Sequence, residues 1–307
     1  MTQTNNMSDQ ILDGTIIKLF NKTSEPEKPS DVVCPHFLEL KWGWGCPYDC
    51  SFCYLKGTFR FYLEEGRVKP HYKPRGKIKT HVEAFLGLDL EPAILNTGEL
   101  CDSLMDEGQA NPFSKFIMPL FQGSKHKILF LTKGTRVKQF LDHPEWRSNA
   151  VLSWSLNAAP AAERWEKLAP PVADRIKAAK EVFDADYEVR LRIDPMVPIE
   201  NWLKHYSNLA DEVFSNLFPE RITLGSLRGL VSTRSSVKDK SWLEYLSEKS
   251  SWGLKPSHST RLEMYRALTD YLRKEYGYEN VGLCKETLKI WNDLGMDRRQ
   301  NQCNCIQ

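Results

Sequence analysis

The sequence lacks any apolar run of the roughly 18 residues that a membrane-spanning helix needs. Its first segment, Met1 to Asp13, also lacks the basic and apolar regions of a secretory signal peptide. Charge of one sign is not in excess, because 42 basic residues stand against 40 acidic ones and the formal net charge is +2. These absences argue against a membrane protein, a disordered chain and a strongly basic nucleic-acid binder. We therefore expect a cytoplasmic protein with no membrane partner.

Cysteine is also scarce, since eight in 307 residues are too few to cross-link a secreted scaffold. Cytosolic thiols stay reduced, so the clustering of these residues favours metal binding over disulfides. The first group is Cys46, Cys50 and Cys53, the second is Cys284, Cys303 and Cys305, and Cys34 and Cys101 lie outside both.

Six short apolar or β-branched runs, each of strand length, alternate with segments of helical spacing. This alternation predicts an α/β fold of parallel strands joined by right-handed crossovers. Six units fit a partial (βα)6 TIM-type barrel better than a closed barrel of eight, and active sites in such barrels lie at the carboxyl ends of the strands. The six runs are residues 37–41, 93–97, 127–132, 151–156, 188–193 and 221–224.

Three regions differ in composition along the chain. Residues 1–30 are polar, with an apolar patch only at 16–20, and predict a flexible N-terminal arm. Residues 31–230 contain the six units of the barrel. Residues 231–307 predict a mainly helical C-terminal region that ends in a cysteine-containing tail.

The first cysteine group has CxxxCxxC spacing directly after a predicted strand. A structural zinc site closes its coordination with four ligands, whereas three thiolates around a four-iron cluster leave one iron open to a small molecule. This spacing, with the aromatic Phe52 before the third cysteine, resembles the radical S-adenosylmethionine (SAM) superfamily. The resemblance implies a [4Fe-4S] cluster on Cys46, Cys50 and Cys53, whose open iron binds SAM and which cleaves it to a 5′-deoxyadenosyl radical. A zinc knuckle or three buried core thiols are the alternatives.

Other strand-end residues match the places where that superfamily contacts SAM. For each of them a solvated charge or a strand-end hydroxyl is the alternative interpretation. The resemblance also implies an electron donor such as flavodoxin or ferredoxin. The expected SAM-binding residues are Gly98, Glu99, Lys133, Ser155, Asn157 and Arg192.

The run from Gly45 to Thr58 is particularly similar to the spore photoproduct lyase family, and the similarity covers about residues 34–230. Members of that family reverse a thymine dimer in DNA and return a hydrogen through a thiol and nearby tyrosines. Here Phe52 lacks the hydroxyl proposed for that relay, although Tyr54 keeps its place. Cys101 lies in the expected loop but about two residues out of register. Cys101 and Tyr54 are therefore candidates for returning hydrogen, with a buried structural cysteine as the alternative for Cys101.

The second cysteine group departs from the lyases proper. Cys284, Cys303 and Cys305 are one ligand short of a closed iron–sulfur site, and Cys34, a substrate or another chain could supply the fourth. A second iron–sulfur cluster, a zinc site and a tail of idle thiols all remain open.

Basic residues or histidines occupy every odd position from Arg67 to His81. A period of two matches an extended chain, so we expect all eight side chains to project from one side of a surface ribbon that tracks DNA phosphates. Pro70, Pro74 and Gly76 oppose a helix there. A solvated edge strand is the alternative.

The leading interpretation is thus a lyase-like radical SAM enzyme of DNA repair that abstracts hydrogen from a nucleic acid. An alternative keeps the chemistry but acts on a peptide or a small metabolite and carries a second C-terminal cluster. A third is a non-catalytic zinc-dependent nucleic-acid-binding protein.

Overall fold

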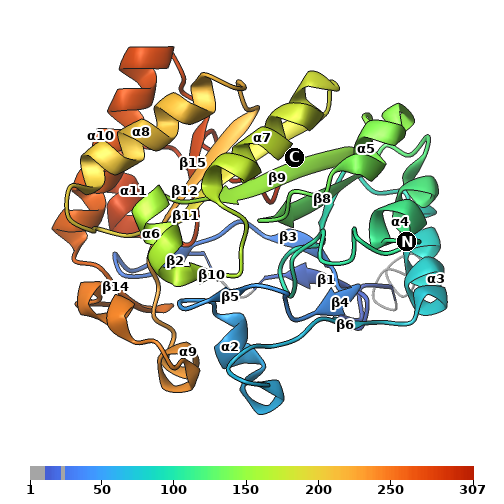
Figure 1. The fold of residues 1–307 in the computed structure, drawn as a ribbon, viewed down its shortest axis with the longest axis horizontal. Helices are drawn as coiled ribbons and strands as arrows, with labels where there is room; N and C mark the ends of the chain where they lie inside the picture. The colour runs from blue at the N-terminus through green and yellow to red at the C-terminus, as the bar shows by residue number, and fades with distance from the viewer. Residues whose placement is uncertain (1–10, 22–24) are drawn as a thin grey trace.

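A computed structural model describes residues 11–21 and 25–307. Its centre is a curved sheet of eight strands (Figure 1). The strands follow the spatial order β1 (Ile17–Phe20), β3 (Phe37–Leu40), β7 (Ile94–Asn96), β8 (Lys127–Thr132), β9 (Ala150–Leu156), β11 (Glu188–Met196), β12 (Arg221–Ser226) and β15 (Val281–Leu283). From β3 to β15 all neighbours pair in parallel, while β1 runs antiparallel to β3.

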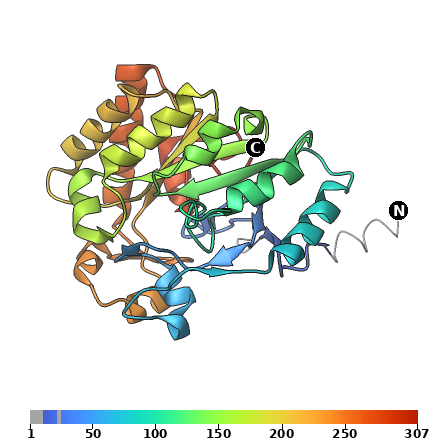
Figure 2. The same cartoon turned by 45° about the vertical axis from the view of Figure 1, so that its right-hand side comes forward.

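Helices cover one face of the sheet, and the other face curves around the chain's loops (Figures 1 and 2). The helices between and after the strands are α3 (Arg75–Leu86), α4 (Phe113–Phe121), α5 (Lys138–Asp142), α6 (Ala159–Trp165), α7 (Val172–Asp184), α8 (Trp202–Phe214), α10 (His258–Tyr276) and α11 (Leu288–Leu294). Two further short helices, α2 (Leu55–Thr58) and α9 (Val231–Ser236), pack against each other. Single 3-10 turns form η1 (Arg60–Tyr62), η2 (Pro144–Trp146) and η3 (Ser241–Tyr245).

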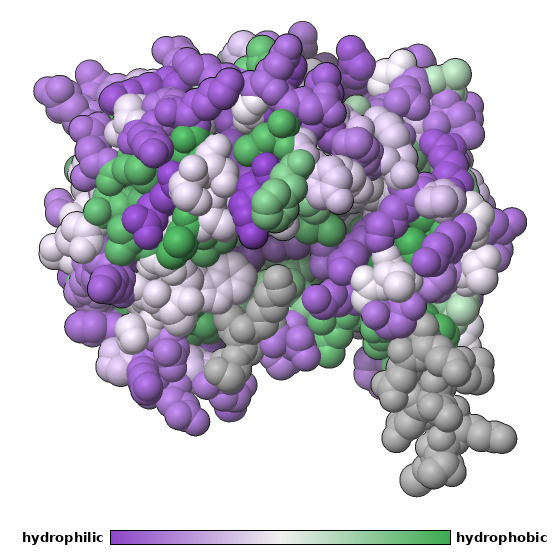
Figure 3. All heavy atoms as spheres, turned by 90° about the horizontal axis from the view of Figure 1, so that it is seen from below, coloured by the Kyte–Doolittle hydropathy of each residue, from purple (hydrophilic) through white to green (hydrophobic). Residues whose placement is uncertain are grey.

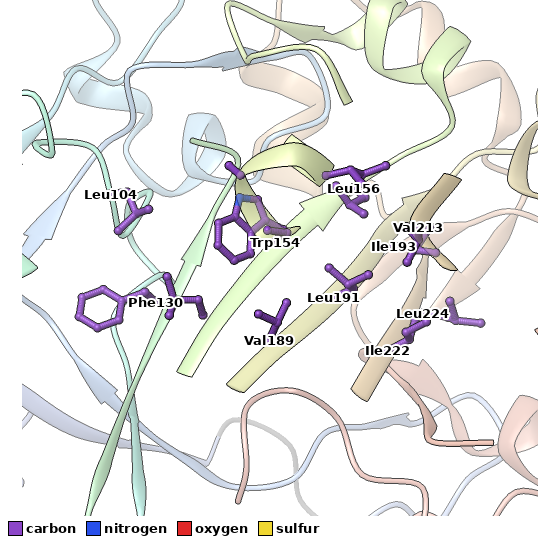
Figure 4. Packing of buried hydrophobic residues seen from close by; sticks show 14 of the residues in the cluster. Leu104, Phe130, Trp154, Leu156, Val189, Leu191, Ile193, Val213, Ile222 and Leu224 are labelled. Atoms are coloured by element: carbon purple, nitrogen blue, oxygen red, sulfur yellow. The ribbon is translucent and has the colours of Figure 1, made fainter. Parts of the chain in front are cut away.

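The alternation of side chains along the strands separates an apolar face from a polar one. In β9, Trp154 and its neighbours two residues away belong to the main core under the helices, and Leu191 of β11 packs there too (Figure 4). The intervening Ser153 and Arg190 face the opposite side, where they contact the C-terminal tail. Successive side chains of a strand point to opposite faces, so most polar side chains of the strands lie on the buried concave face, where Ile94, Leu129 and Val151 form a small apolar cluster.

Four two-stranded ribbons tie loops to one another around this sheet. They are β2 (Val32–Val33) with β16 (Glu286–Thr287), β4 (Gly43–Trp44) with β6 (His71–Tyr72), β5 (Asp49–Cys50) with β10 (Glu166–Lys167), and β13 (Glu248–Ser250) with β14 (Gly253–Lys255). Two of them, β4–β6 and β5–β10, hold the segment that carries the first cysteine group.

The predicted partial barrel is confirmed, because all six predicted runs are neighbouring parallel strands in their sequence order. Two strands extend it. Residues 17–20 were expected in a flexible arm but form β1, since Ile17 and Phe20 are buried against β3. Residues 1–10 and 22–24 of that expected arm lie outside the described residues. At the opposite edge, β15 of the C-terminal region pairs with β12, so this region continues the main sheet.

Among the residues described, no helix combines the length and apolar character that crossing a membrane would require.

Asn304 anchors the C-terminal tail in the concave face. Its Nδ2 donates to Ser153 Oγ (2.9 Å) and to the Leu191 carbonyl (2.8 Å), and its Oδ1 accepts from Thr223 Oγ1 (2.6 Å). The residue is fully buried. The tail is therefore fixed by polar contacts with three neighbouring strands.

We expect Asn304→Ala to lower the free energy of unfolding by about 3 kcal/mol, because it leaves buried polar partners unsatisfied. Chemical denaturation of the two proteins measures the difference. Asn292→Ala removes the same amide from an exposed position of α11 and should change stability by less than about 0.5 kcal/mol. Equal effects of the two substitutions would show that the tail does not stabilise the fold.

Candidate active site

The loop with CxxxCxxC spacing begins at a glycine that no other residue could replace without a shift of the backbone. Gly45 has φ +88°, and a Cβ there would lie 2.0 Å from the Lys69 carbonyl oxygen. Directly after it, the Cys46 backbone N–H donates to the Val68 carbonyl (2.8 Å). Gly45 therefore lets this loop, which follows the first parallel strand, pack closely against residues 68–69.

The three thiols of this loop are largely removed from water. Cys50 is buried, and Cys46 and Cys53 are half-buried. Burial raises the pKa of each thiol, while the charge of Lys133 opposes this effect at Cys50 and Cys53. Three soft donors on one buried loop, next to a cation that compensates thiolate charge, fit an iron–sulfur cluster with three protein ligands.

Lys133, directly after β8, meets two other predicted residues at the end of β9. Its Nζ donates to Ser155 Oγ (2.6 Å) and to Glu166 Oε1 (3.1 Å). Asn157 Nδ2 donates to the same Glu166 oxygen at 3.3 Å. The structure thus brings Lys133, Ser155 and Asn157 together, as their places at strand ends predicted.

Glu166 and Arg175 complete this group and were missed in the sequence. Arg175 Nη1 lies 2.5 Å from Glu166 Oε2, and both side chains are buried. Burial alone would raise the pKa of Glu166, but Lys133 and Arg175 hold it below the usual value. Neither residue belongs to a recognisable motif in the sequence.

Gly98 and Glu99 follow β7, and their loop packs tightly against β8. A Cβ on Gly98 would lie 2.6 Å from Leu131 Cβ, so this position requires glycine. The Glu99 carboxylate pairs with Lys285 Nζ at 3.1 Å, and its backbone carbonyl accepts from the Tyr54 hydroxyl. Glu99 therefore meets Tyr54 and Lys285, rather than the group around Lys133.

Cys101 and Arg192 have surroundings that the sequence did not indicate. Cys101 is buried, and its thiol donates to the Thr97 carbonyl with Sγ 3.4 Å from the oxygen. Arg192 directs its guanidinium to the C-terminal thiols, with Nη2 3.0 Å from Cys305 Sγ and Nη1 3.8 Å from Cys284 Sγ. Arg192 is thus placed between the barrel strands and the tail.

Asp102 is a further residue of the site that sequence analysis gave no role. Its Oδ1 accepts from Thr132 Oγ1 (2.7 Å), and its Oδ2 accepts from the Lys133 backbone N–H (2.8 Å). Burial raises the pKa of Asp102, and these hydrogen bonds oppose the rise. Asp102 holds the loop after β7 to the end of β8, and so positions Lys133.

The basic segment differs from its expected geometry. Residues 75–81 belong to helix α3, so the eight basic side chains do not project from one side of an extended ribbon. Pro74 stands at the N-cap of α3 and Gly76 lies in the first turn, where proline and glycine do not break a helix. Lys69 pairs with Glu64 at 2.7 Å, and His71 stacks on Trp44 with ring centroids 3.8 Å apart.

Within the described part of the chain, no three His, Cys, Asp or Glu side chains are arranged to hold a single metal ion.

A half-barrel of parallel strands, with three thiols in CxxxCxxC spacing after its first parallel strand, places the chain in the class of radical SAM proteins. A family model described as "Spore photoproduct lyase" matches residues 38–234, and the chain belongs to this family.

Individual relatives agree with this assignment. A spore photoproduct lyase of Clostridium acetobutylicum is 21% identical over 181 residues, which are 56% of this chain and 50% of that protein. The chain thus matches about half the length of this curated relative.

Solved structures show the same fold. A spore photoproduct lyase complexed with dinucleoside spore photoproduct has a TM-score of 0.66 at 15% identity, over 87% of this chain and 80% of that one. A mutant of that enzyme with bound AdoMet and the same dinucleoside has a TM-score of 0.64 at 14% identity, over 85% and 78%.

The loop after β7 contains a buried acid, Glu107, whose titration should be visible in stability. Burial raises its pKa to about 7 from the usual 4.5, while Ser114 has the opposite effect. The folded state therefore binds this proton more tightly than the unfolded chain, and stability falls as pH rises from 4.5 through about 7.

We expect Glu107→Gln to remove this pH-dependent loss of stability. The free energy of unfolding of the variant should therefore rise relative to that of the parent by about 1–3 kcal/mol between about pH 5 and pH 8. Denaturation curves at several pH values measure it, with Glu163→Gln on the exposed face of α6 as the control. A constant difference across this pH range would contradict the assigned burial of Glu107.

Proposed function

We propose that this chain is a radical SAM enzyme that abstracts hydrogen from a damaged nucleic acid. The observation that carries the proposal is the buried three-thiol loop in a chain whose family model spans residues 38–234. Cys46, Cys50 and Cys53 would hold a [4Fe-4S] cluster. When bound, such a cluster supplies the electron for cleavage of SAM, and a flavodoxin- or ferredoxin-type protein would deliver that electron.

The group around Lys133 would bind the polar end of SAM. Lys133 suits a carboxylate, and Ser155 and Asn157 can each offer a hydrogen bond once a ligand replaces their present contacts. Glu166 orients Lys133 through the 3.1 Å ion pair and is a positioning residue. Gly98 lets the loop after β7 pack closely against β8. The Glu99 carboxylate would contact the SAM ammonium once its ion pair with Lys285 is broken.

Two groups that contact or belong to the loop of residues 97–101 could return hydrogen. The Tyr54 hydroxyl donates to the carbonyl of Glu99, and the Cys101 thiol donates to the carbonyl of Thr97. Both candidates are thus held against one short loop beside the three-thiol segment. Arg192 faces Cys305 and is therefore less well placed to bind SAM than the sequence suggested.

A nucleic-acid substrate is supported by an exposed aromatic and basic rim next to the three-thiol loop. Trp44, two residues before Cys46, contacts Phe59 and Tyr62 with centroids 4.9 Å away in each case. Phe61 is 83% exposed, and the Arg60 guanidinium lies 4.4 Å from its ring centroid. Exposed aromatic rings stack on bases, and cations beside them meet phosphates. Lys69 and His71 extend this rim, and the face on which α2 and α9 lie is mostly hydrophilic (Figure 3).

Anaerobically reconstituted protein should convert SAM to 5′-deoxyadenosine when dithionite is present, as followed by chromatography. Changing Cys46, Cys50 and Cys53 together to alanine should abolish the product, because no three-thiol site remains. Cys101→Ala is the matched control, since it removes another buried thiol and should leave this SAM cleavage intact. Product from the triple variant would overturn the site assignment.

Ultraviolet-irradiated DNA should stimulate this turnover, and the stimulation should weaken as salt rises, since phosphate contacts release counterions. Phe61→Ala should raise the Kd for irradiated single-stranded DNA about tenfold, as the loss of one stacked base predicts. Phe218→Ala, at an exposed aromatic on the far side of the barrel, is the control. Fluorescence anisotropy measures the binding. Indifference to DNA would favour a peptide or a small metabolite as substrate.

A further inference from the structure

We propose that Cys34, Cys284, Cys303 and Cys305 together hold a second iron–sulfur cluster, in a four-thiol site within the concave face of the sheet. The ribbon β2–β16 places Cys34 beside Lys285, because Val33 pairs with Glu286 in antiparallel register. Cys284 directly follows β15, and its N–H donates to the Leu224 carbonyl at 2.7 Å. Chain segments about 250 residues apart thus meet at this site.

The tail brings the last two thiols to the same place. A Cβ on Gly282 would lie 2.3 Å from the Gln302 carbonyl oxygen, so only glycine allows the tail to lie against β15. Arg221 Nη1 donates to the Cys303 carbonyl at 2.9 Å, and Asn96 Nδ2 donates to the Cys305 carbonyl at 2.9 Å. Contacts from two well-separated strands, β12 and β7, therefore fix the backbone of both cysteines.

Three of the four thiols belong to one apolar cluster, and the fourth is connected to it through an arginine. Cys303 and Cys305 form a buried cluster with Phe20 and Phe37, and Cys34, Trp252 and Ile306 pack against it. Cys284 is linked to this cluster through Arg192, which contacts the sulfurs of both Cys284 and Cys305. Shielding by aromatic rings is the environment that protects such clusters from water.

Buried arginines beside the thiols favour a negatively charged group at this site. Arg192 is only 8% exposed, its two terminal nitrogens face sulfur atoms, and its Nε has no hydrogen-bond partner among the described residues. Arg228 adds a second contact to Cys284, with Nη1 3.6 Å from Sγ, while Asp194 pairs with its other nitrogen at 2.7 Å. Asp194 is one carboxylate beside two buried guanidinium groups, and a cluster with four thiolates would supply the further negative charge that neutral thiols do not provide.

The all-sulfur donor set and the space beside it favour an iron–sulfur cluster over zinc. Four thiols suit either metal. A cavity of about 300 Å³ is lined by Cys34, Leu283, Cys303 and Ile306, among others, and so leaves space beside two of the four thiols. Arginine N–H groups directed at cysteine sulfur also set the reduction potential of such clusters.

The four-thiol site lies across Tyr54 and Glu99 from the three-thiol loop. Lys285 marks the boundary, with its Nζ 3.1 Å from Glu99 Oε1 and 5.9 Å from the Tyr54 ring centroid. Four cysteines complete the coordination of a cluster, so this one would have no open iron. It would fix the tail in the barrel and leave SAM to the Cys46 loop.

Iron and sulfide assays on anaerobically reconstituted full-length protein test this proposal. We expect about eight iron atoms per wild-type chain and about four in the variant with Cys46, Cys50 and Cys53 changed to alanine, since each cubane holds four. That variant should keep a broad visible absorbance band near 400 nm and an EPR signal on reduction. Changing Cys34, Cys284, Cys303 and Cys305 to serine should remove the other four iron atoms.

Cys101→Ala is the matched control and should keep the full iron content. Loss of all iron from the Cys46 triple variant, or stoichiometric zinc in its place, would overturn the proposal. If the serine variant does not fold, the comparison of wild type with the Cys46 triple variant still decides the question. Failure of the proposed SAM cleavage would be a separate result, because it is measured as 5′-deoxyadenosine rather than as iron.

Discussion

The pairing of β5 with β10 is the contact on which the arrangement of the site depends. It places Cys50 opposite Glu166 and so connects the loop after the first parallel strand with the segment that follows the fourth. Glu166 is buried, and Lys133 and Arg175 neutralise its charge at 3.1 and 2.5 Å. The β5–β10 ribbon thus places the three-thiol loop next to Lys133, the residue that we propose binds SAM. The buried carboxylate of Glu166 holds Lys133 in place.

Charge compensation also explains why the inside of the half-barrel is polar. Seven parallel strands present every second side chain to the concave face, and several of these are arginines or hydroxyl residues. The C-terminal tail satisfies many of them through its backbone, as the contacts of Arg190 and Arg221 with tail carbonyls show. Where the tail offers sulfur instead, as at Arg192, the guanidinium requires a partner with negative charge.

The sequence was sufficient for the barrel because each strand is buried on its helix-facing side and therefore appears as an apolar run. It also located the three-thiol loop, since that site lies within eight consecutive residues. Contacts between segments that are distant in the sequence could not be predicted from it. Glu166 meets Lys133 across 33 residues of sequence, and Arg192 points to a tail more than 100 residues away. Helix α3 was missed because the period of two in charge indicated an extended chain and Pro74 was expected to oppose a helix, although Pro74 stands at the N-cap of α3.

The central claim is that the cluster on the Cys46 loop keeps one iron open for SAM. EPR spectra of the reduced protein, recorded before and after addition of SAM, test it most directly. The account predicts that SAM changes the g values of one cluster signal, because direct coordination alters the electronic structure of the iron. A spectrum that is unchanged by saturating SAM, or a reduced protein without any cluster signal, would contradict it.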